Sequence, residues 1–265
     1  MKRFEKKSIR PISIDIREDK CIVVNNFDGT ISNIDIKSFT ECNRQYICPS
    51  PRDVKIYEEY AYICSDEANS IIIYNIMKNS IEMQLKTGIA PNSIVLCEDT
   101  KMLFCSNLLE DTISIIDLNN NGVLGEVKVG KYPIKVKLSG DKKFIYVCES
   151  NFDEDSKGYI SIYSLNNFNL EKRITTGKTP IDMYEDKGLL YVADFEGGSI
   201  NLINIREGKE EGRLFLGGMP NGVLKHEEKI YVTDYFNGNL YQIDEKFEKI
   251  KIIAIGNEPN AMIIV

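Results

Sequence analysis

Short apolar runs separated by polar turns recur along the whole chain. In the stretch YVADFEGGSINLINI, residues 191–205, two runs rich in Ile, Val and Tyr flank a polar turn that contains glycine. Residues 231–245, YVTDYFNGNLYQIDE, repeat this pattern. Runs of this composition, bounded by Asn, Asp and Gly, are typical of β-strands joined by a tight turn. The pattern therefore predicts a β-hairpin that occurs more than once.

A proline marks each repeat of a longer unit. After each proline come a short apolar run, a charged turn, the hairpin and a fourth apolar run, and the hairpin is found in six versions. No segment keeps a helical period of 3.6 residues over ten or more positions. The sequence thus predicts six units of four strands each, about 40 residues long. The marking prolines are Pro11, Pro51, Pro91, Pro133, Pro180, Pro220 and Pro259.

A period of about 40 residues with four strands is that of a β-propeller blade. One such sheet cannot bury both of its faces, so we expect residues 1–265 to form a single all-β domain in which the blades stack in a ring. The last residues, PNAMIIV, repeat the inner-strand signal once more. Six blades are therefore the prediction, and seven with an incomplete terminal blade the alternative. That alternative would leave ladder hydrogen bonds unmade.

The repeated YVAD and YVTD motifs, at residues 191 and 231, resemble those of the YVTN-type β-propeller repeat proteins. The resemblance covers residues 11–265 and implies a propeller, most often of seven blades in that family. The chain departs from the family motif at its third residue, where Cys64, Ser106 and Cys148 stand. These departures affect packing more than fold.

Acidic and aromatic residues gather in the predicted turns between the second and third strands of the blades. In propellers these turns lie on one face of the ring, called the upper face here, and loops on a rigid scaffold often carry binding residues. An acidic face with interleaved rings suits a basic peptide, a basic protein loop or a small cation. The alternative is that turns simply favour Asp, Asn and Gly, and that the rings pack on their neighbours. The candidate binding residues are Phe27, Asp28, Asp66, Glu67, Glu110, Asp111, Phe152, Asp153, Asp155, Phe195, Glu196, Tyr235 and Phe236.

The bulk composition limits the partners and the compartment. A net charge of −7 and a pI near 5.1 disfavour binding to nucleic acid or to an anionic membrane. The N-terminal residues lack the apolar stretch of a signal peptide. The odd number of cysteines, seven, indicates reduced thiols. We therefore expect a cytoplasmic protein that binds neither nucleic acid nor membrane.

Signals of catalysis are weak in this sequence. The only histidine, His226, lies in a turn predicted on the opposite, lower face, whereas propeller lyases use a histidine near the central channel. DEDSKGYI, residues 153–160, matches a calcium loop only in part, because Lys157 stands where an oxygen ligand belongs. We therefore predict a binding scaffold with no catalytic residue, metal or cofactor. The alternative is a metal-dependent lactonase-like or lyase-like enzyme that uses Asn92, Asn221 and Asn260 at the channel mouth.

Overall fold

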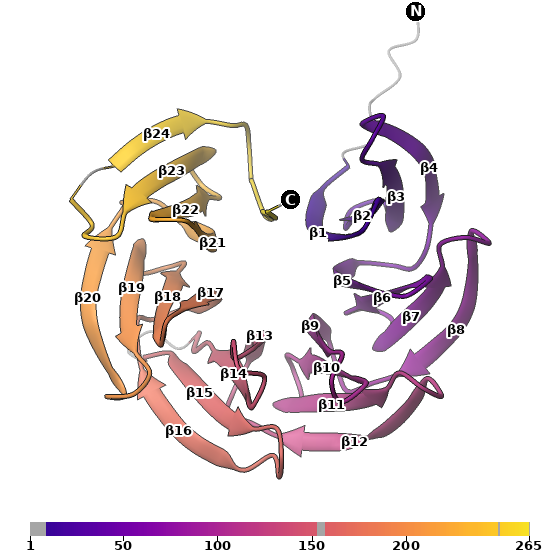
Figure 1. Ribbon diagram of the computed structural model, residues 1–265, viewed down its shortest axis with the longest axis horizontal. Coiled ribbons are helices and arrows are strands. Elements are labelled where there is room, and N and C mark those ends of the chain that lie inside the picture. The colour runs from indigo at the N-terminus through magenta and orange to yellow at the C-terminus, as the bar shows by residue number, and fades with distance from the viewer. Residues whose placement is uncertain (1–8, 153–156, 249, 265) are drawn as a thin grey trace, which may run out of the picture.

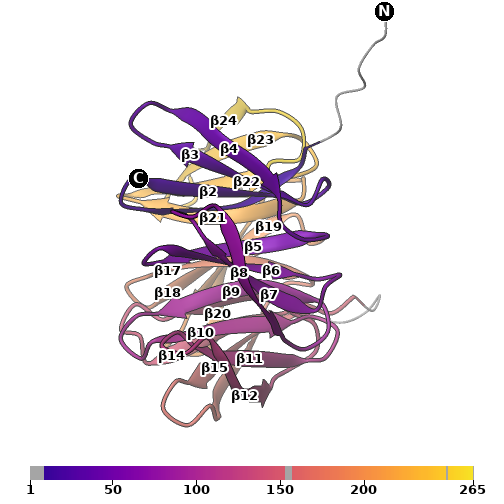
Figure 2. The same ribbon diagram turned by 90° about the vertical axis from the view of Figure 1, so that its right-hand side faces the viewer.

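The computed structural model describes residues 9–152, 157–248 and 250–264, and they form six four-stranded antiparallel sheets around a central axis (Figure 1). Seen from the edge, the sheets stack as the blades of a disc (Figure 2). The prediction of an all-β propeller with six blades is confirmed. None of the described segments is a helix that could cross a bilayer.

The blades follow one another in chain order, and within each blade the strands run from the channel outwards. Blade 1 comprises β1 (Pro11–Arg17), β2 (Lys20–Asn25), β3 (Thr30–Asp35) and β4 (Thr40–Tyr46), and blade 2 comprises β5 (Pro51–Tyr57), β6 (Tyr60–Ser65), β7 (Ser70–Asn75) and β8 (Ser80–Lys86). Blade 3 comprises β9 (Pro91–Cys97), β10 (Met102–Asn107), β11 (Thr112–Asp117) and β12 (Gly122–Lys128), and blade 4 comprises β13 (Pro133–Leu138), β14 (Phe144–Glu149), β15 (Tyr159–Ser164) and β16 (Leu170–Thr175). Blade 5 comprises β17 (Pro180–Asp186), β18 (Leu189–Asp194), β19 (Ser199–Asn204) and β20 (Lys209–Phe215), and blade 6 comprises β21 (Pro220–His226), β22 (Lys229–Asp234), β23 (Asn239–Asp244) and β24 (Ile250–Ala254).

The recurring Asp and Gly of the hairpin have separate structural roles. The carboxylate of Asp234, at the end of β22, accepts hydrogen bonds from the backbone N–H groups of Phe236 and Asn237 in the turn and of Met219 in the connection from blade 5. Gly238 closes the same turn with φ of 66°, a backbone conformation that glycine adopts without steric cost. The repeated motif therefore stabilises the turn and joins it to the preceding blade.

Apolar side chains between neighbouring blades make up the core. Tyr62 and Cys64 of β6 pack in one buried cluster with Leu103 and Cys105 of β10 in the next blade. Successive residues of a strand point to opposite faces of the sheet, so each blade contributes one apolar set to the blade before it and another to the blade after it. Stacking of the blades, rather than any single sheet, thus buries the apolar surface.

The C-terminal segment, residues 257–264, runs back toward the channel between blade 6 and blade 1 (Figure 1). Asn221 of β21 donates a hydrogen bond through Nδ2 to the carbonyl oxygen of Pro259 at 2.9 Å. Asn260 donates through Nδ2 to the carbonyl oxygen of Pro11 at 3.5 Å. The C-terminal segment, whose last residues repeat the inner-strand signal, therefore bridges the two terminal blades, although residues 257–264 form no strand.

Thiol reactivity provides a first test of this packing. Burial raises the pKa of Cys48 to about 12 and also raises the pKa values of Cys64 and Cys148, which disfavours their reactive thiolate forms. In the folded protein we expect rapid labelling by a thiol reagent of Cys42 alone, because it is exposed and the six other cysteines are buried. Mass spectrometry after brief labelling, with a urea-unfolded sample as control, measures this. Fast labelling of Cys64 or Cys148 would contradict it.

Candidate functional site

The predicted turns lie on the upper face together with the connections between blades. Asn26, in the turn between β2 and β3, donates a hydrogen bond to the carbonyl oxygen of Pro51, where the next blade begins. The backbone N–H of Tyr235 bonds to the carbonyl oxygen of Met219 at 2.9 Å. The candidate residues thus share one edge of the disc, except Asp153 and Asp155, which lie outside the described residues.

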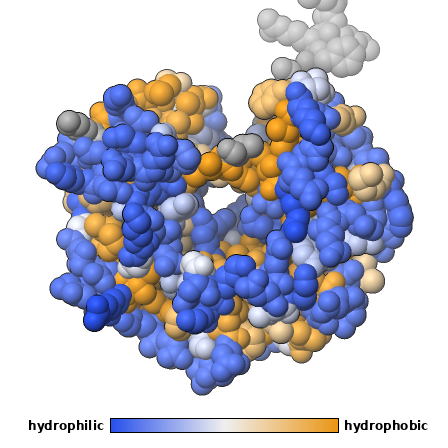
Figure 3. Space-filling view, viewed as in Figure 1, coloured by the Kyte–Doolittle hydropathy of each residue, from blue (hydrophilic) through white to orange (hydrophobic). Residues whose placement is uncertain are grey.

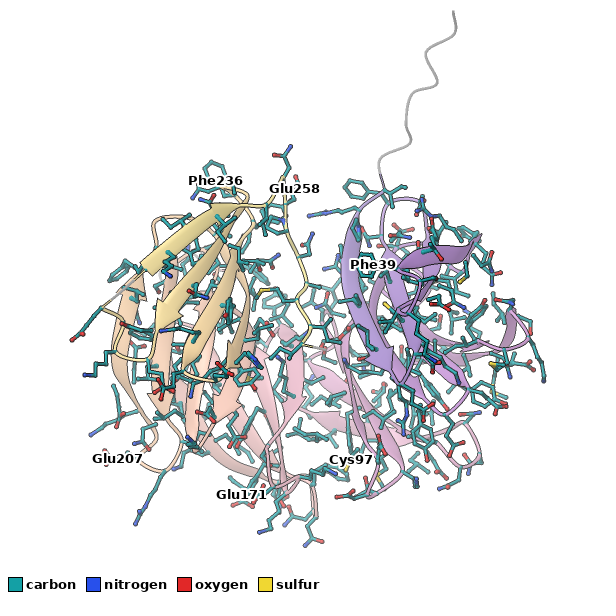
Figure 4. The ribbon with its side chains drawn as sticks, turned by 45° about the horizontal axis from the view of Figure 1, so that its top comes forward. Phe39, Cys97, Glu171, Glu207, Phe236 and Glu258 are labelled. Carbon is teal, nitrogen blue, oxygen red and sulfur yellow. The ribbon has the colours of Figure 1, made fainter. Side chains whose placement is uncertain are left out.

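The candidate aromatic residues are of two kinds. Phe27 and Phe236 are 58% and 71% exposed, and Phe152 is also exposed. Phe195 and Tyr235 are half-buried and pack on one another with ring centroids 5.8 Å apart. Figure 4 shows Phe236 projecting from the same edge as Glu258, opposite the edge that carries Glu171 and Glu207. Three aromatic rings on the upper face are therefore exposed to solvent.

An arginine of the chain lies among these rings. The guanidinium carbon of Arg10 is 5.0 Å from the ring centroid of Phe27 and 5.4 Å from that of Tyr235. Its Nη2 donates a hydrogen bond to the hydroxyl of Tyr235 at 2.7 Å, and its Nε lies 3.4 Å from a carboxylate oxygen of Glu258. Each cation–π contact is worth about 0.5–1 kcal/mol at an exposed site. We call these four residues the Arg10 cluster.

Three of the candidate acids are engaged with nearby backbone groups. Asp28 accepts hydrogen bonds from the backbone N–H and the hydroxyl of Thr30, at 3.2 and 2.8 Å. Glu110 and Asp111 each accept one from a backbone N–H in the connection to a blade, at 2.8 and 3.0 Å. These contacts fit the turn-forming role that was the alternative to binding.

Two further candidate acids have basic neighbours, and a third candidate acid is exposed to solvent. Asp66 lies 3.8 Å from Nε of Arg52, and Glu196 lies 2.7 Å from Nζ of Lys178. Glu67 is exposed. Sequence analysis of the turns alone missed these cations, because Arg52 is the second residue of the inner strand β5 and Lys178 belongs to the connection that leads to β17. Their positions beside the blade prolines, which place them near the upper face, were the signal that could have found them.

The inner strands enclose a central cavity of about 720 Å³, visible as the hollow of the disc (Figure 3). At its mouth Asn92 accepts a hydrogen bond from Nε of Arg52 at 3.0 Å and donates one to the carbonyl oxygen of Ile134 at 2.6 Å. Asn221 donates to Oδ1 of Asn260 at 3.0 Å. In this structure Asn92 thus links neighbouring inner strands, and Asn221 and Asn260 link the C-terminal segment to β21 and β1.

Deeper in the channel wall, charged groups alternate in sign. Asp53 is buried and accepts hydrogen bonds from the hydroxyls of Ser13 and Ser93, and its Oδ2 lies 3.7 Å from Nζ of Lys135. Although burial opposes ionisation, the ammonium groups of Lys135 and Lys55 lower the pKa of Asp53 to about 2. Burial likewise opposes the charge of Lys135, but Asp53 and Asp182 raise its pKa. These charges therefore stabilise each other around the channel.

Other features bear on the enzyme alternative. His226 lies at the end of β21 on the lower face and is exposed. Among the described residues, no group of His, Cys, Asp and Glu side chains has the arrangement of a metal site. At the channel mouth the side-chain oxygens of Asn92 and Asn260 accept hydrogen bonds from Arg52 and Asn221.

Comparison with solved structures finds many propellers of distant sequence. Hydrazine synthase from Kuenenia stuttgartiensis is similar with a TM-score of 0.80 at 14% identity, covering 92% of this chain and 80% of that chain. Virginiamycin B lyase from Staphylococcus aureus is similar with a TM-score of 0.78 at 13% identity, and the match covers 93% of this chain and 85% of that chain. The WD40 domain of Pan2 from Neurospora crassa is similar with a TM-score of 0.74 at 10% identity, and the match covers 95% of this chain and 80% of that chain. At these identities the likeness is one of fold.

No curated protein matches the sequence. A family model described as YNCE-like beta-propeller matches residues 60–205, which is more than half of the chain. This family is related to the YVTN-type repeats that the motifs resemble, and it is the one that the match names. The chain therefore belongs to the YNCE-like β-propeller family.

Proposed function

We propose that this protein is a non-enzymatic binding scaffold whose upper face takes a basic peptide or an arginine-bearing loop of a partner protein. The observation that carries the proposal is the Arg10 cluster, in which two aromatic rings and a carboxylate accommodate a guanidinium group. The upper face also carries exposed rings and acids, with Phe236 71% exposed and Glu67 on the surface. Arginine is the side chain that uses rings and carboxylates together.

The contribution of charge is modest in this proposal. Asp66 and Glu196 have basic neighbours, so their attraction for a partner is partly compensated. Acids on an exposed face mainly raise the rate of encounter, whereas buried aromatic anchors slow dissociation. The rings should therefore contribute more to affinity than the acids do.

Binding of a fluorescein-labelled peptide of alternating arginine and glycine, followed by fluorescence anisotropy, tests the proposal. We expect Phe27→Ala and Phe236→Ala to weaken binding by about tenfold each, mainly through faster dissociation. Arg10→Ala should tighten binding, because it vacates the space between Phe27 and Tyr235, and adding Phe27→Ala to it should remove that gain. The affinity should also fall as salt is raised.

The matched controls are a peptide of alternating aspartate and glycine and the lower-face variant Glu227→Gln/Glu228→Gln, whose two residues are exposed. The acidic peptide should not bind, and the lower-face variant should bind the arginine peptide as the parent protein does. Equal binding of the arginine peptide by the parent protein and both phenylalanine variants would refute the assignment of the upper face.

A further inference from the structure

The space between blade 6 and blade 1, called the terminal gap here, differs from the five other junctions of the ring. Figure 1 shows the C-terminal segment entering it, and in Figure 3 a notch with apolar residues on both flanks opens at this place. The repeat allows each flank to be compared, position by position, with blades that have a neighbour.

The flank of blade 1 carries apolar side chains that would meet a preceding blade. Two repeat positions form this surface, namely the third residue after the blade proline and the fourth residue of the second strand. In blade 1 these are Ile14 and Val23, and both are partly exposed. In blades 2 to 6 all of their counterparts are buried: Val54, Ile94, Val136, Met183, Val223, Ile63, Cys105, Val147, Val192 and Val232.

The flank of blade 6 shows the complementary difference. Tyr231 of β22 and Leu240 of β23 are partly exposed. Their counterparts in blades 1 to 5 are buried: Ile22, Tyr62, Phe104, Tyr146, Tyr191, Ile31, Ile71, Ile113, Ile160 and Ile200. Ile253, paired with Leu240, is 59% exposed, whereas Ile174, at the same place in blade 4, is 1% exposed. Both flanks thus have the composition of a blade junction without its burial.

The innermost layer of the missing blade is already present. Residues 260–264 line the channel where an inner strand would lie, and Asn221 and Asn260 bond this segment to blades 6 and 1. Residues 257–264 pair with no strand, so this segment offers unpaired backbone groups toward the gap. In the other blades a second and a third strand lie outside the inner strand, and the terminal gap has room at those two positions.

We propose that the terminal gap binds a β-hairpin of a partner protein, which adds to residues 259–264 and forms a three-stranded seventh blade with them. Addition of a strand to a free edge supplies the backbone hydrogen bonds, and the flanks select the side chains. The hairpin must carry apolar residues on both faces, because both flanks are apolar. It should also carry one polar side chain near Tyr231, whose hydroxyl accepts a hydrogen bond from Gln242 at 3.0 Å. The Arg10 cluster joins blades 1 and 6 at the upper edge of the same gap, whereas the proposed hairpin lies along residues 259–264.

A hairpin of the chain itself has the required pattern and can serve as the probe. We expect a synthetic peptide of residues 189–205, LLYVADFEGGSINLINI, to bind the full chain at a ratio of one to one and to raise its melting temperature. A peptide of the same composition without the alternation should do neither. Calorimetry and thermal unfolding measure the two effects.

Variants of the flanks give the decisive comparison. Ile253→Asp and Val23→Asp should each weaken peptide binding by about tenfold or more, because an unpaired carboxylate would be buried against apolar surface. Val123→Asp is the matched control, since Val123 lies on the outer strand β12 and is 43% exposed. Ile253→Asp changes a largely exposed side chain, so its own melting temperature should stay near that of the parent protein.

Several results would overturn the proposal. One is failure of the parent protein to bind the peptide, and another is unchanged binding by Ile253→Asp. Light scattering that shows a dimer abolished by Ile253→Asp would assign the gap to a second copy of the chain. Peptide binding that occurs only after deletion of residues 1–8 would assign it to that part of the chain.

Discussion

A chain that ends at residue 258 is expected to be less stable than the full chain by about 2–4 kcal/mol, which lowers the melting temperature by roughly 5–15 °C. The truncation removes the hydrogen bonds from Asn221 to Pro259 and Asn260, at 2.9 and 3.0 Å. It also removes Met262, whose methyl carbon lies near Gly222 of β21. Because the segment bridges blades 6 and 1, its loss should loosen both.

Thermal unfolding followed by circular dichroism measures this effect. Asn260→Ala, which removes only the side-chain bonds of that residue, should cause a smaller loss than the truncation. Glu227→Gln, on the exposed lower face, should cause none. Identical melting temperatures for the full and shortened chains would show that the terminal blades do not depend on the segment.

The second large effect is expected at Asp53. Asp53→Ala should destabilise the fold by about 3–5 kcal/mol, because it leaves Lys135 charged near the channel without its nearest carboxylate. It also removes the acceptor of the bonds from Ser13, Ser93 and the backbone of Ile94. Combining Asp53→Asn with Lys135→Met should recover part of the loss, since no unpaired charge remains. Urea unfolding at neutral pH provides the free energies.

The same carboxylate predicts a pH dependence. The pKa of Asp53 is about 2 in the folded protein, below its ordinary value of 3.8. A carboxyl with a depressed folded pKa contributes its full stability above the ordinary value and loses it as the pH falls through the folded value. The parent protein should therefore lose stability between about pH 4 and pH 2 more steeply than Asp53→Asn. Parallel losses in the two proteins would exclude Asp53 as the cause.

Much of the architecture could be predicted from local sequence. The alternation in residues 191–205 and 231–245, the glycine that permits the turn, and the prolines that recur about every 40 residues all act within a single blade. Because each blade repeats these short-range signals, the number of blades and the edge that carries the turns follow from counting. The location of the candidate turn residues on the upper face was predictable for this reason.

The chemistry of the sites depended on contacts between distant parts of the chain. Arg10 reaches Tyr235, which is 225 residues away in the sequence, and Lys135 approaches Asp53 from another blade. Whether an acid such as Asp28 serves its own turn or a partner also depends on which donors the folded chain brings near it. Likewise, the exposure of Ile253 follows from the absence of a neighbouring blade and not from its own strand. The sequence by itself determined the repeating unit, because strand and turn preferences are local, and only the tertiary structure decided which charges, rings and flanks meet, because ring closure joins residues that no local pattern relates.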